Sequence, residues 1–470
     1  MADPRRASPP ESPRLRRLQR DLGRAPKRSL ARFWREIERR GTPLVEPVAR
    51  NDPRAVGGST DPDRTVTDHD HLVTLLFRGK SNVRSVEVQC SFGSSFPTRL
   101  EHLPGPDVWY RTWRLSDRFR GSYRFVVNLP ERGPLSNLSW IERTRRSITD
   151  PLNPRRFLDP TDPGDPGGPH GFASSEIVMP RAPDRAWLRE GFTGRVQGRL
   201  VEERIESRAL RRQFPRPWWE KRRIPGRHDR RRVWVYLPGG AGTGAGPRSV
   251  DPRNLVVFLD GFDYAHVLAA PATLEALARR GSIGPTAALF VEHGPKNYRG
   301  VDLWWNEPFG EFLADELLPW ARGRFGWSKL SATRTVLAGA SLGGQTAMLW
   351  ALRRPEVFGA VLSQSGSFQN APDPFREEPN WTARWVADHP RVPIRVHLEV
   401  GLRETVLPFG ATRYPTILSS NRHLRDALRA KGYPLSYSEF DGGHDDGCWR
   451  QTLADGLVAL LGRPSARPKR

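Results

Sequence analysis

The spacing of hydrophobic and polar residues changes along the chain and divides it into parts. Residues 29–40 (SLARFWREIERR) carry apolar side chains at helical spacing, and Gly41 follows as a helix stop. We therefore predict a short amphipathic helix within the segment 29–50. The residues before it, 1–28, are rich in arginine and proline and have little to bury, which predicts a disordered basic tail.

From about residue 65 to about residue 130, apolar and polar residues alternate in short runs separated by Gly, Pro and Asp. Runs such as VRSVEVQCSF, DVWYRTWRL and GSYRFVVNL are typical of antiparallel strands, and their regular spacing predicts a small β-sandwich. The stretch 150–172 has so many Pro, Gly and Asp residues that we expect a linker there. We assign residues 51–190 to the sandwich domain with this linker, and residues 191–229 to a connecting segment.

Within residues 230–465, continuous apolar runs alternate with helical stretches. The apolar runs are VWVYLP, NLVVFLDG, TAALFVEH, RTVLAG, AVLSQSG and IRVHLEVG, and segments such as GGQTAMLWALRR lie between them. Strands of this kind, joined by crossover helices, form a mostly parallel sheet that is covered on both faces. The glycine-rich insert at 239–247 is expected to be a surface loop between the first two strands.

Composition adds a strong positive charge. The formal net charge is +23, and only seven of the 75 basic residues are lysines. Such an excess of arginine follows from GC-rich coding, but it also gives a basic surface that attracts an anionic ligand. Both interpretations stay open.

Several classes of protein fit the sequence poorly. The two cysteines, Cys90 and Cys448, are far apart and show no metal-binding spacing. No recognised nucleic-acid-binding motif is present. The N-terminus lacks an apolar signal segment, and no apolar run is long enough to cross a membrane. We therefore expect a cytoplasmic protein that binds neither nucleic acid nor membrane.

The segment TRTVLAGASLGGQTAMLWALRR combines a predicted strand, the motif Gly-x-Ser-x-Gly and a predicted helix. The serine is Ser341, and Gly339 and Gly343 flank it. In a nucleophile elbow the serine occupies a strained turn, and the glycines let strand and helix pass close to it. The bare motif also occurs in ordinary glycine-rich turns. The strand before it, the helix after it and the third glycine, Gly344, favour a serine nucleophile in an α/β-hydrolase fold.

In this fold the acid and then the histidine follow the serine along the chain. We select His444 as the general base, because it lies in EFDGGHDDGCW, where two glycines free the loop after a predicted strand. The alternative for His444 is an exposed loop histidine. Among the other histidines, His397 lies within a predicted strand, His423 lies on a helix and His389 precedes a proline.

The acid is expected after the strand IRVHLEVG. Glu404, in GLRET, is the first candidate, because it follows the strand at the edge where such sites assemble. Glu399 lies nearer the middle of the strand and is an alternative. The remaining candidates are three aspartates close to the histidine: Asp441, Asp445 and Asp446.

A Ser–His–acid triad predicts acyl transfer through attack of the serine on an ester carbonyl. The resulting oxyanion needs two preorganised N–H donors. One is the backbone N–H of Leu342, directly after the serine. The other is expected from the loop after VVFLDG, which makes Gly261 or Phe262 the candidate.

Ordered segments between about residues 30 and 462 resemble the enterochelin (ferric-enterobactin) esterase family. They include FWREIERRGTPLVEP, DVWYRTWRL, DPLNPRRF, SSEIVMPRAP, VVFLDGFDYAH, AGASLGGQTA, FGAVLSQSGSF, LEVGLRE and DGGHDDGCWR. The resemblance implies an N-terminal β-sandwich domain and a C-terminal esterase domain whose catalytic core is Ser341 and His444. It also supports Glu404 as the third member.

The substrate implied by the resemblance is a trilactone siderophore with catechol groups, usually as its anionic ferric complex. Iron then belongs to the substrate, and we expect no cofactor and no metal site in the protein. Arg299 and Arg403, in loops expected to border the pocket, are candidate anion contacts. Trp304, Trp305 and Asn306 are candidates for stacking on or orienting the catechols. Ordinary surface arginines and core aromatics are the alternatives.

Two other functions stay open. A β-sandwich before an esterase domain also suits a carboxylesterase that acts on feruloyl or acetyl esters. The second alternative is a non-catalytic ligand-binding protein with the same fold. The intact elbow, followed by a histidine in the expected order, argues against this alternative. The oligomeric state is left open.

Overall fold

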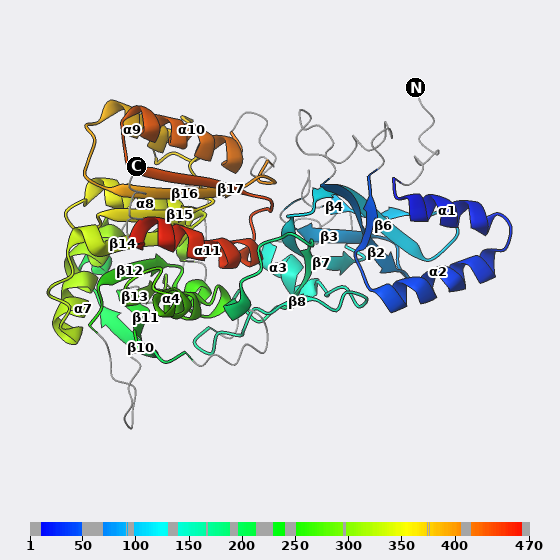
Figure 1. Ribbon diagram of the computed structural model, residues 1–470, viewed down its shortest axis with the longest axis horizontal. Helices are drawn as coiled ribbons and strands as arrows, with labels where there is room; N and C mark the ends of the chain where they lie inside the picture. The colour runs from blue at the N-terminus through cyan, green and yellow to red at the C-terminus, as the bar shows by residue number, and fades with distance from the viewer. Residues whose placement is uncertain are drawn as a thin grey trace, which may run out of the picture. The chain divides into compact units, whose positions relative to one another are not determined.

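The structure, a computed structural model, describes residues 11–48, 69–90, 92, 98–129, 140–165, 168–188, 196–212, 229–239, 251–294, 298–373, 375, 377–405 and 415–462. Contacts divide the chain into two compact units. The first comprises residues 1–161, 169–182 and 441–445, and the second comprises residues 162–168, 183–440 and 446–470. In Figure 1 the first unit runs mostly from blue to cyan and the second mostly from green to red.

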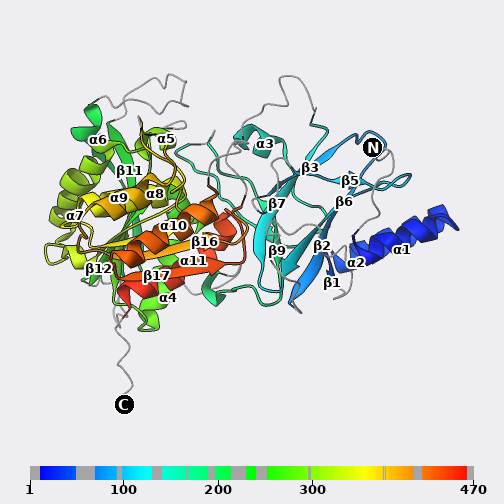
Figure 2. The ribbon, with the colours of Figure 1, turned by 90° about the horizontal axis from the view of Figure 1, so that it is seen from above.

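The first unit is a sandwich of two antiparallel sheets (Figure 2), as the alternating runs predicted. Their strand orders are β1-β2-β6-β5 and β4-β3-β7-β9-β8. Side chains from both sheets, such as Leu75, Trp113 and Phe125, form one buried apolar cluster. The elements are β1 (Leu44–Pro47), β2 (Asp70–Arg78), β3 (Val86–Cys90), β4 (Thr98–Arg99), β5 (Glu101–His102), β6 (Val108–Ser116), β7 (Arg120–Val127), α3 (Trp140–Arg146), β8 (Arg156–Phe157) and β9 (Ser174–Val178).

The N-terminal segment is helical where the sequence predicted a disordered tail. Helix α1 (Pro13–Leu22) lies within the segment 1–28, of which residues 1–10 are outside the described part. Leu15 and Leu18 are fully buried in an apolar cluster with the next helix. The tail prediction is therefore wrong for α1, because leucines at helical spacing supply a buried face although the segment as a whole is basic.

The predicted amphipathic helix is α2 (Pro26–Arg40), which begins three residues before the expected start. Phe33, Trp34 and Ile37 are buried, and the cluster that holds them includes Leu76 of β2. The outer face of this sheet is thus covered by α1 and α2. This explains why β2 is buried on both of its faces instead of alternating with solvent.

The second unit contains an eight-stranded sheet in the order β10-β11-β13-β12-β14-β15-β16-β17. The pairs β10/β11 and β11/β13 are antiparallel, and all later pairs are parallel. The mostly parallel sheet predicted from the apolar runs is confirmed. Its strands are β10 (Arg199–Glu206), β11 (Arg230–Leu237), β12 (Asn254–Leu259), β13 (Thr286–Val291), β14 (Thr335–Ala340), β15 (Ala360–Gln364), β16 (Arg395–Gly401) and β17 (Leu435–Phe440).

Helices cover both faces of this sheet. Val361 and Leu398 belong to a cluster with side chains of α7, α8 and α10. Leu362 and His397, one residue away on the same strands, instead lie against Gly456 of α11. The elements are η3 (Ala186–Leu188), η4 (Ala209–Arg211), η5 (Asp263–Val267), α4 (Ala270–Arg279), α5 (Arg299–Asp302), α6 (Glu307–Glu311), η6 (Phe312–Leu317), α7 (Leu318–Phe325), η7 (Ala332–Arg334), α8 (Leu342–Arg353), α9 (Trp381–Asp388), α10 (Ile417–Ala430) and α11 (Asp446–Leu461).

Two segments predicted to be connections contain strands. The segment 191–229 was expected to be a connection, but it contains β10, which pairs over its whole length with β11. The stretch 150–172, expected to be a linker, contributes β8 to the sandwich. Both strands lie at sheet edges, where few apolar residues are needed. Most of the insert 239–247 lies outside the described residues.

The parallel strands place several loops at one edge of the sheet. Strands β12, β14, β15 and β16 are neighbours in that order, and they point the same way. Their carboxyl ends therefore lie along one edge, as do the residues that follow them: Asp260, Ser341, Ser365 and Leu402.

Candidate active site

Ser341 occupies a strained turn between β14 and α8. Its backbone angles, φ 57° and ψ −123°, lie in a region that residues other than glycine rarely adopt. Neighbouring groups hold the turn in place. The Ser341 N–H donates to the carbonyl of Gln364 at 2.9 Å, and the Ser341 carbonyl accepts from the N–H of Ser367 at 3.0 Å. This is the geometry that the predicted nucleophile elbow requires.

Glycines are needed on both sides of Ser341 because neighbouring atoms come very close to the backbone there. A Cβ on Gly339 would lie 2.4 Å from the carbonyl carbon of Gly343. A Cβ on Gly344 would lie 2.5 Å from Oγ of Ser363. No side chain fits at either position without moving the elbow. The third glycine, which strengthened the motif in the sequence, therefore has a packing role of its own.

The first predicted oxyanion donor begins helix α8. Leu342 is the first residue of the helix, where backbone N–H groups have no partner within the helix. The Ser341 side chain is half-buried, and its Oγ lies 3.3 Å from Oγ of Ser367. Sequence reasoning missed Ser367, although it stands in the segment QSGSF that carried the family resemblance.

The two candidates for the second donor differ in their surroundings. The N–H of Phe262 donates to Oε2 of Glu292 at 2.9 Å, so it is already engaged within the chain. Gly261 lies so close to β13 that a Cβ there would be 2.7 Å from the backbone of Phe290. Glu292 was not singled out in the sequence, and its contact favours Gly261 over Phe262 as the donor.

Glu404 is buried and held by hydrogen bonds from two segments. It follows β16, and only 4% of its surface is exposed. Its Oε1 accepts from Oγ of Ser365 at 2.5 Å and from the N–H of Gly401 at 2.8 Å. Ser365 in turn accepts from Nε1 of Trp449 at 2.9 Å. A carboxylate fixed in this way suits the acid of a triad, and its catalytic role stays a prediction.

Glu399, the alternative acid, belongs to a different network. Its Oε1 accepts from Nε2 of Gln364 at 2.6 Å and also from the hydroxyl of Thr452. Its Oε2 lies 3.3 Å from Nε2 of His397, whose Nδ1 is 3.1 Å from Oγ of Ser436. Thr452 joins this network to α11, and Ser436 belongs to the neighbouring strand β17. Glu399 and His397 therefore have partners of their own in the packed interior.

His444 lies in the five-residue segment 441–445, whose contacts place it in the first unit. The segment is fastened on both sides of the histidine. Asp441 accepts from the N–H of Arg120 through its carbonyl at 3.1 Å. The carboxylate of Asp445 accepts from the N–H and the hydroxyl of Ser122 at 2.9 and 2.6 Å. The carboxylate of Asp441 also accepts from the hydroxyl of Ser116.

These contacts bear on the choice of acid. Asp441 and Asp445, two of the three alternative aspartates, use their carboxylates to anchor the segment 441–445 to the sandwich. Ser341 and Glu404 belong to the second unit and His444 to the first. The catalytic partnership of these three residues stays a prediction, which rests on their order in the chain and on the elbow.

Arg299 forms a two-point ion pair with Asp260, the residue after β12. Its Nε and Nη2 donate to the two carboxylate oxygens at 2.5 and 2.8 Å, and Nη2 also lies 3.4 Å from the carbonyl of Ala340. Burial alone lowers the pKa of the Arg299 guanidinium, but the Asp260 carboxylate outweighs it and raises the pKa above its usual value. Arg299 thus ties two loops together beside Ser341, a role that the sequence did not reveal.

The other predicted substrate contacts, Asn306, Arg403 and Trp304, are all buried. Asn306 caps α6, since its Oδ1 accepts from the N–H of Phe309 at 3.0 Å and its Nδ2 donates to the carbonyl of Val301 at 3.2 Å. Arg403 is 4% exposed. Trp304 is also mostly buried, and it borders a pocket. Contact of these residues with a substrate stays a prediction.

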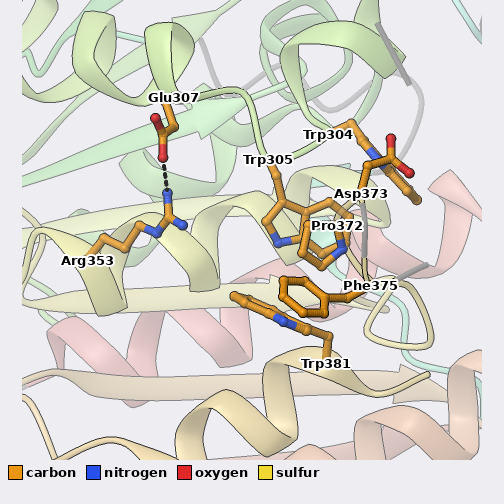
Figure 3. A pocket seen from close by; sticks show the side chains of 8 residues that line it. All are labelled: Trp304, Trp305, Glu307, Arg353, Pro372, Asp373, Phe375 and Trp381. Atoms are coloured by element: carbon orange, nitrogen blue, oxygen red, sulfur yellow. Dashed lines mark hydrogen bonds and ion pairs between the residues drawn. The ribbon is translucent and has the colours of Figure 1, made fainter. Parts of the chain in front are cut away.

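The pocket beside Trp304, which we call the tryptophan pocket, has a volume of about 330 Å³. Figure 3 shows the side chains around it. Three tryptophans and a phenylalanine make up half of the lining residues, and an ion pair and a carboxylate lie at the rim. The lining residues are Trp304, Trp305, Glu307, Arg353, Pro372, Asp373, Phe375 and Trp381.

None of the helices in the described ranges combines the length and the apolar character needed to cross a bilayer.

Comparison with known proteins assigns both halves of the chain. An esterase family model matches residues 227–460, and a model of the enterochelin esterase N-terminal domain matches residues 72–188. The iron(III) enterobactin esterase of Escherichia coli O6:H1 is 30% identical over 386 residues, which cover 78% of this chain and 82% of the relative. The iron(III) salmochelin esterase of the same strain is 28% identical over 461 residues, which cover 92% and 94%.

A solved structure agrees with these matches. The crystal structure of the enterobactin esterase from Shigella flexneri, determined in the presence of enterobactin, superposes with a TM-score of 0.61. The two sequences are 27% identical, and the superposition covers 84% of this chain and 94% of the other. With a sandwich matching the N-terminal family model and a hydrolase sheet matching the esterase model, the chain belongs to the enterochelin esterase family.

Proposed function

We propose that the protein is a serine esterase that cleaves the ester bonds of a catecholate siderophore. The observation that carries the catalytic part is the backbone of Ser341, held at φ 57° between β14 and α8. Strain of this kind costs about 1–3 kcal/mol and is concentrated at functional sites. An ordinary glycine-rich turn would place a glycine at this position instead.

In the proposed mechanism His444 accepts the Oγ proton of Ser341 while Oγ attacks the ester carbonyl carbon. The tetrahedral intermediate collapses, and the alcohol leaves with the proton from His444. Water then attacks the acyl-enzyme, giving up a proton to His444, and the free acid is released as Ser341 regains its hydrogen. Glu404 orients the imidazole and stabilises its charged form.

The oxyanion of both intermediates is assigned to the N–H groups of Leu342 and Gly261. Leu342 starts α8, and its N–H is directed by the helix start. Gly261 is preferred to Phe262, whose N–H is bound to Glu292. Loss of one such donor typically raises the barrier by about 3 kcal/mol.

The substrate class is supported by the relatives. The chain aligns over 92% of its length with an iron(III) salmochelin esterase and over 78% with an iron(III) enterobactin esterase. A trilactone holds its three catechols ready to bind one iron. Cleaving the ester backbone removes this preorganisation and weakens the chelate, so that iron can be released.

The positive charge of the protein favours binding of an anionic substrate. The net charge of +23 attracts an anionic ferric catecholate over a distance limited by salt. Arg403 remains the candidate for a direct anion contact. Arg299 already holds Asp260, so we assign it first to positioning the loops beside Ser341.

The test compares purified protein on ferric enterobactin and on methyl ferulate, with products identified by mass spectrometry. We expect linear dihydroxybenzoylserine products from the first and much slower turnover of the second. A preference for the ferulate would replace the siderophore with a feruloyl-type substrate. Labelling with a fluorophosphonate probe, with Ser341→Ala as control, separates an esterase from a binding protein, which would not react.

A further inference from the structure

The tryptophan pocket is built from aromatic rings set at right angles. The rings of Trp304 and Trp305 are 4.7 Å apart at 84°, and those of Trp305 and Trp381 are 6.1 Å apart at 89°. Phe375, which is 46% exposed, stands at the mouth. In Figure 3 the rings of Trp305, Phe375 and Trp381 gather around the same space. A flat ring entering this space meets aromatic surface on several sides.

The wall of the pocket is fastened to the elbow. Leu342, the residue after the nucleophile, packs against the cluster that contains Trp304 and Trp305. The hydroxyl of Thr346, one turn along α8, donates to the carbonyl of Leu303 at 2.7 Å. The wall of the pocket is therefore in direct contact with the first turn of α8, which begins immediately after Ser341. We take a group bound there to belong to the same molecule as the ester bound at Ser341.

Trp305 brings two features that point to a ligand. Its backbone has φ 47°, an unfavourable value for a bulky residue, and such strain is often found at ligand clamps. Its side chain is only 7% exposed, and among the described residues its indole Nε1–H has no acceptor. A buried donor without an acceptor is costly unless a ligand supplies one.

The charge at the rim restricts the ligand further. Arg353 lies 3.3 Å from Glu307, so its positive charge is largely neutralised. Asp373 adds a second carboxylate to the lining. The charges of the described lining residues thus sum to one negative charge, although the chain as a whole is strongly positive. An anionic ring is disfavoured here, and a neutral ring with an oxygen that can accept from Trp305 is favoured.

We infer that the tryptophan pocket binds one uncharged aromatic arm of the substrate next to the ester that is cleaved. The inference rests on the proposed function and sharpens it. A volume of about 330 Å³ is at the lower end for ligand pockets and suits a single ring with its amide, rather than three catechols around one iron. The pocket therefore selects esters that carry an aryl amide, and prefers an arm that is free of metal.

The first experiment measures two matched esters, N-(2,3-dihydroxybenzoyl)serine methyl ester and N-acetylserine methyl ester. In Trp305→Leu and in the exposed variant Phe375→Ala, we expect KM for the aryl ester to rise about threefold to tenfold, the effect of lost aromatic contacts. The kcat/KM for the acetyl ester is expected to fall much less, so that the preference for the aryl ester shrinks. Trp385→Leu is the control, because Trp385 lies on α9, as does Trp381, but does not line the pocket.

Equal effects on both esters, or no change in KM for the aryl ester in either variant, would overturn the inference. The two proposals can fail separately. If neither ester is hydrolysed while a fluorophosphonate still labels Ser341, the proposed substrate class is wrong. Calorimetry then decides on the pocket by itself: the aryl ester must bind Ser341→Ala more tightly than the acetyl ester, and the preference must disappear on adding Phe375→Ala.

The charge argument has its own measurement. Asp373→Asn removes a rim carboxylate without changing the size of the side chain. We expect it to lower KM for ferric enterobactin by a few fold and to leave KM for iron-free enterobactin unchanged, with the difference shrinking at high salt. An equal change for both forms would contradict the preference for a metal-free arm.

Discussion

The hydroxyl of Ser365 donates a hydrogen bond of 2.5 Å to the carboxylate of Glu404. Ser365 follows β15, Glu404 follows β16, and the two strands are parallel neighbours. Trp449 of α11 donates to the same hydroxyl. The position of the proposed acid is therefore set by residues that are 39 and 45 positions away from it in the sequence.

Replacing Ser365 tests this support. Ser365→Ala removes a hydrogen bond to a charged group, worth about 1.5–3 kcal/mol, so kcat is expected to fall about tenfold or more while KM stays nearly constant. Steady-state kinetics on ferric enterobactin gives both constants. Ser436→Ala, which removes a hydroxyl beside His397 in the same sheet, is the control and should keep its kcat.

The acid itself can be identified by comparing two glutamates. Glu404→Gln should lower kcat by about 10³–10⁴-fold with little effect on substrate affinity, because the amide favours the wrong imidazole tautomer. Glu399→Gln should lower thermal stability more than turnover, since Glu399 joins Gln364 and Thr452 in the interior. Full activity of Glu404→Gln would assign the acid to another residue.

Arg299 and Asp260 are expected to depend on each other. Arg299→Ala leaves the buried carboxylate of Asp260 without its cation. Because Arg299 is partly exposed, we expect a loss near the lower end of the about 3–5 kcal/mol typical of broken buried pairs. The double variant with Asp260→Asn should recover most of this stability in thermal denaturation. Additive losses would show that the pair is not coupled.

Arg403 is the residue for which we predict a direct contact with the substrate, unlike Arg299, which pairs with Asp260. If it contacts an anionic substrate, Arg403→Ala should raise KM for ferric enterobactin with little change in kcat, and the effect should weaken as salt is added. Assays at low and high ionic strength decide this. A KM that does not respond to salt would return Arg403 to a purely structural role.

The anchor of the histidine segment gives a further prediction. Asp445 accepts two hydrogen bonds from Ser122 directly beside His444. Ser122→Ala should therefore slow both turnover and fluorophosphonate labelling of Ser341, by about tenfold for a lost bond to a carboxylate. Asp455→Asn, farther along α11 in a partly exposed pair with Arg185, serves as control. Unchanged labelling in Ser122→Ala would mean that the base is held by other groups.

Local patterns made the elbow predictable. The motif around Ser341 has its strand, turn and helix within about twenty residues, and the close contact between Gly339 and Gly343 lies within that short segment. The same holds for the apolar runs of the parallel sheet. Where the contacts that determine a structure are local, the order of residue types is sufficient to predict that structure.

Contacts between distant segments could not be predicted in this way. The sequence offers no sign that Arg299 pairs with Asp260, that Glu292 takes the N–H of Phe262, or that Ser365 supports the acid. Helix α1 was missed for a different reason. Its overall composition is basic, and only the spacing of its leucines shows the face that becomes buried.

The fastening of residues 441–445 has a consequence for how the chain can be divided. The hydrogen bonds described above for Asp441 and Asp445 come from residues 116–122, at the end of β6 and the start of β7. A fragment that begins after the sandwich would keep the serine, the glutamate and the histidine in its sequence but lose every one of these tethers. We therefore expect a truncation that removes the first half to leave His444 without its support, so that the fragment turns over its substrate slowly even where the serine and the glutamate keep their positions.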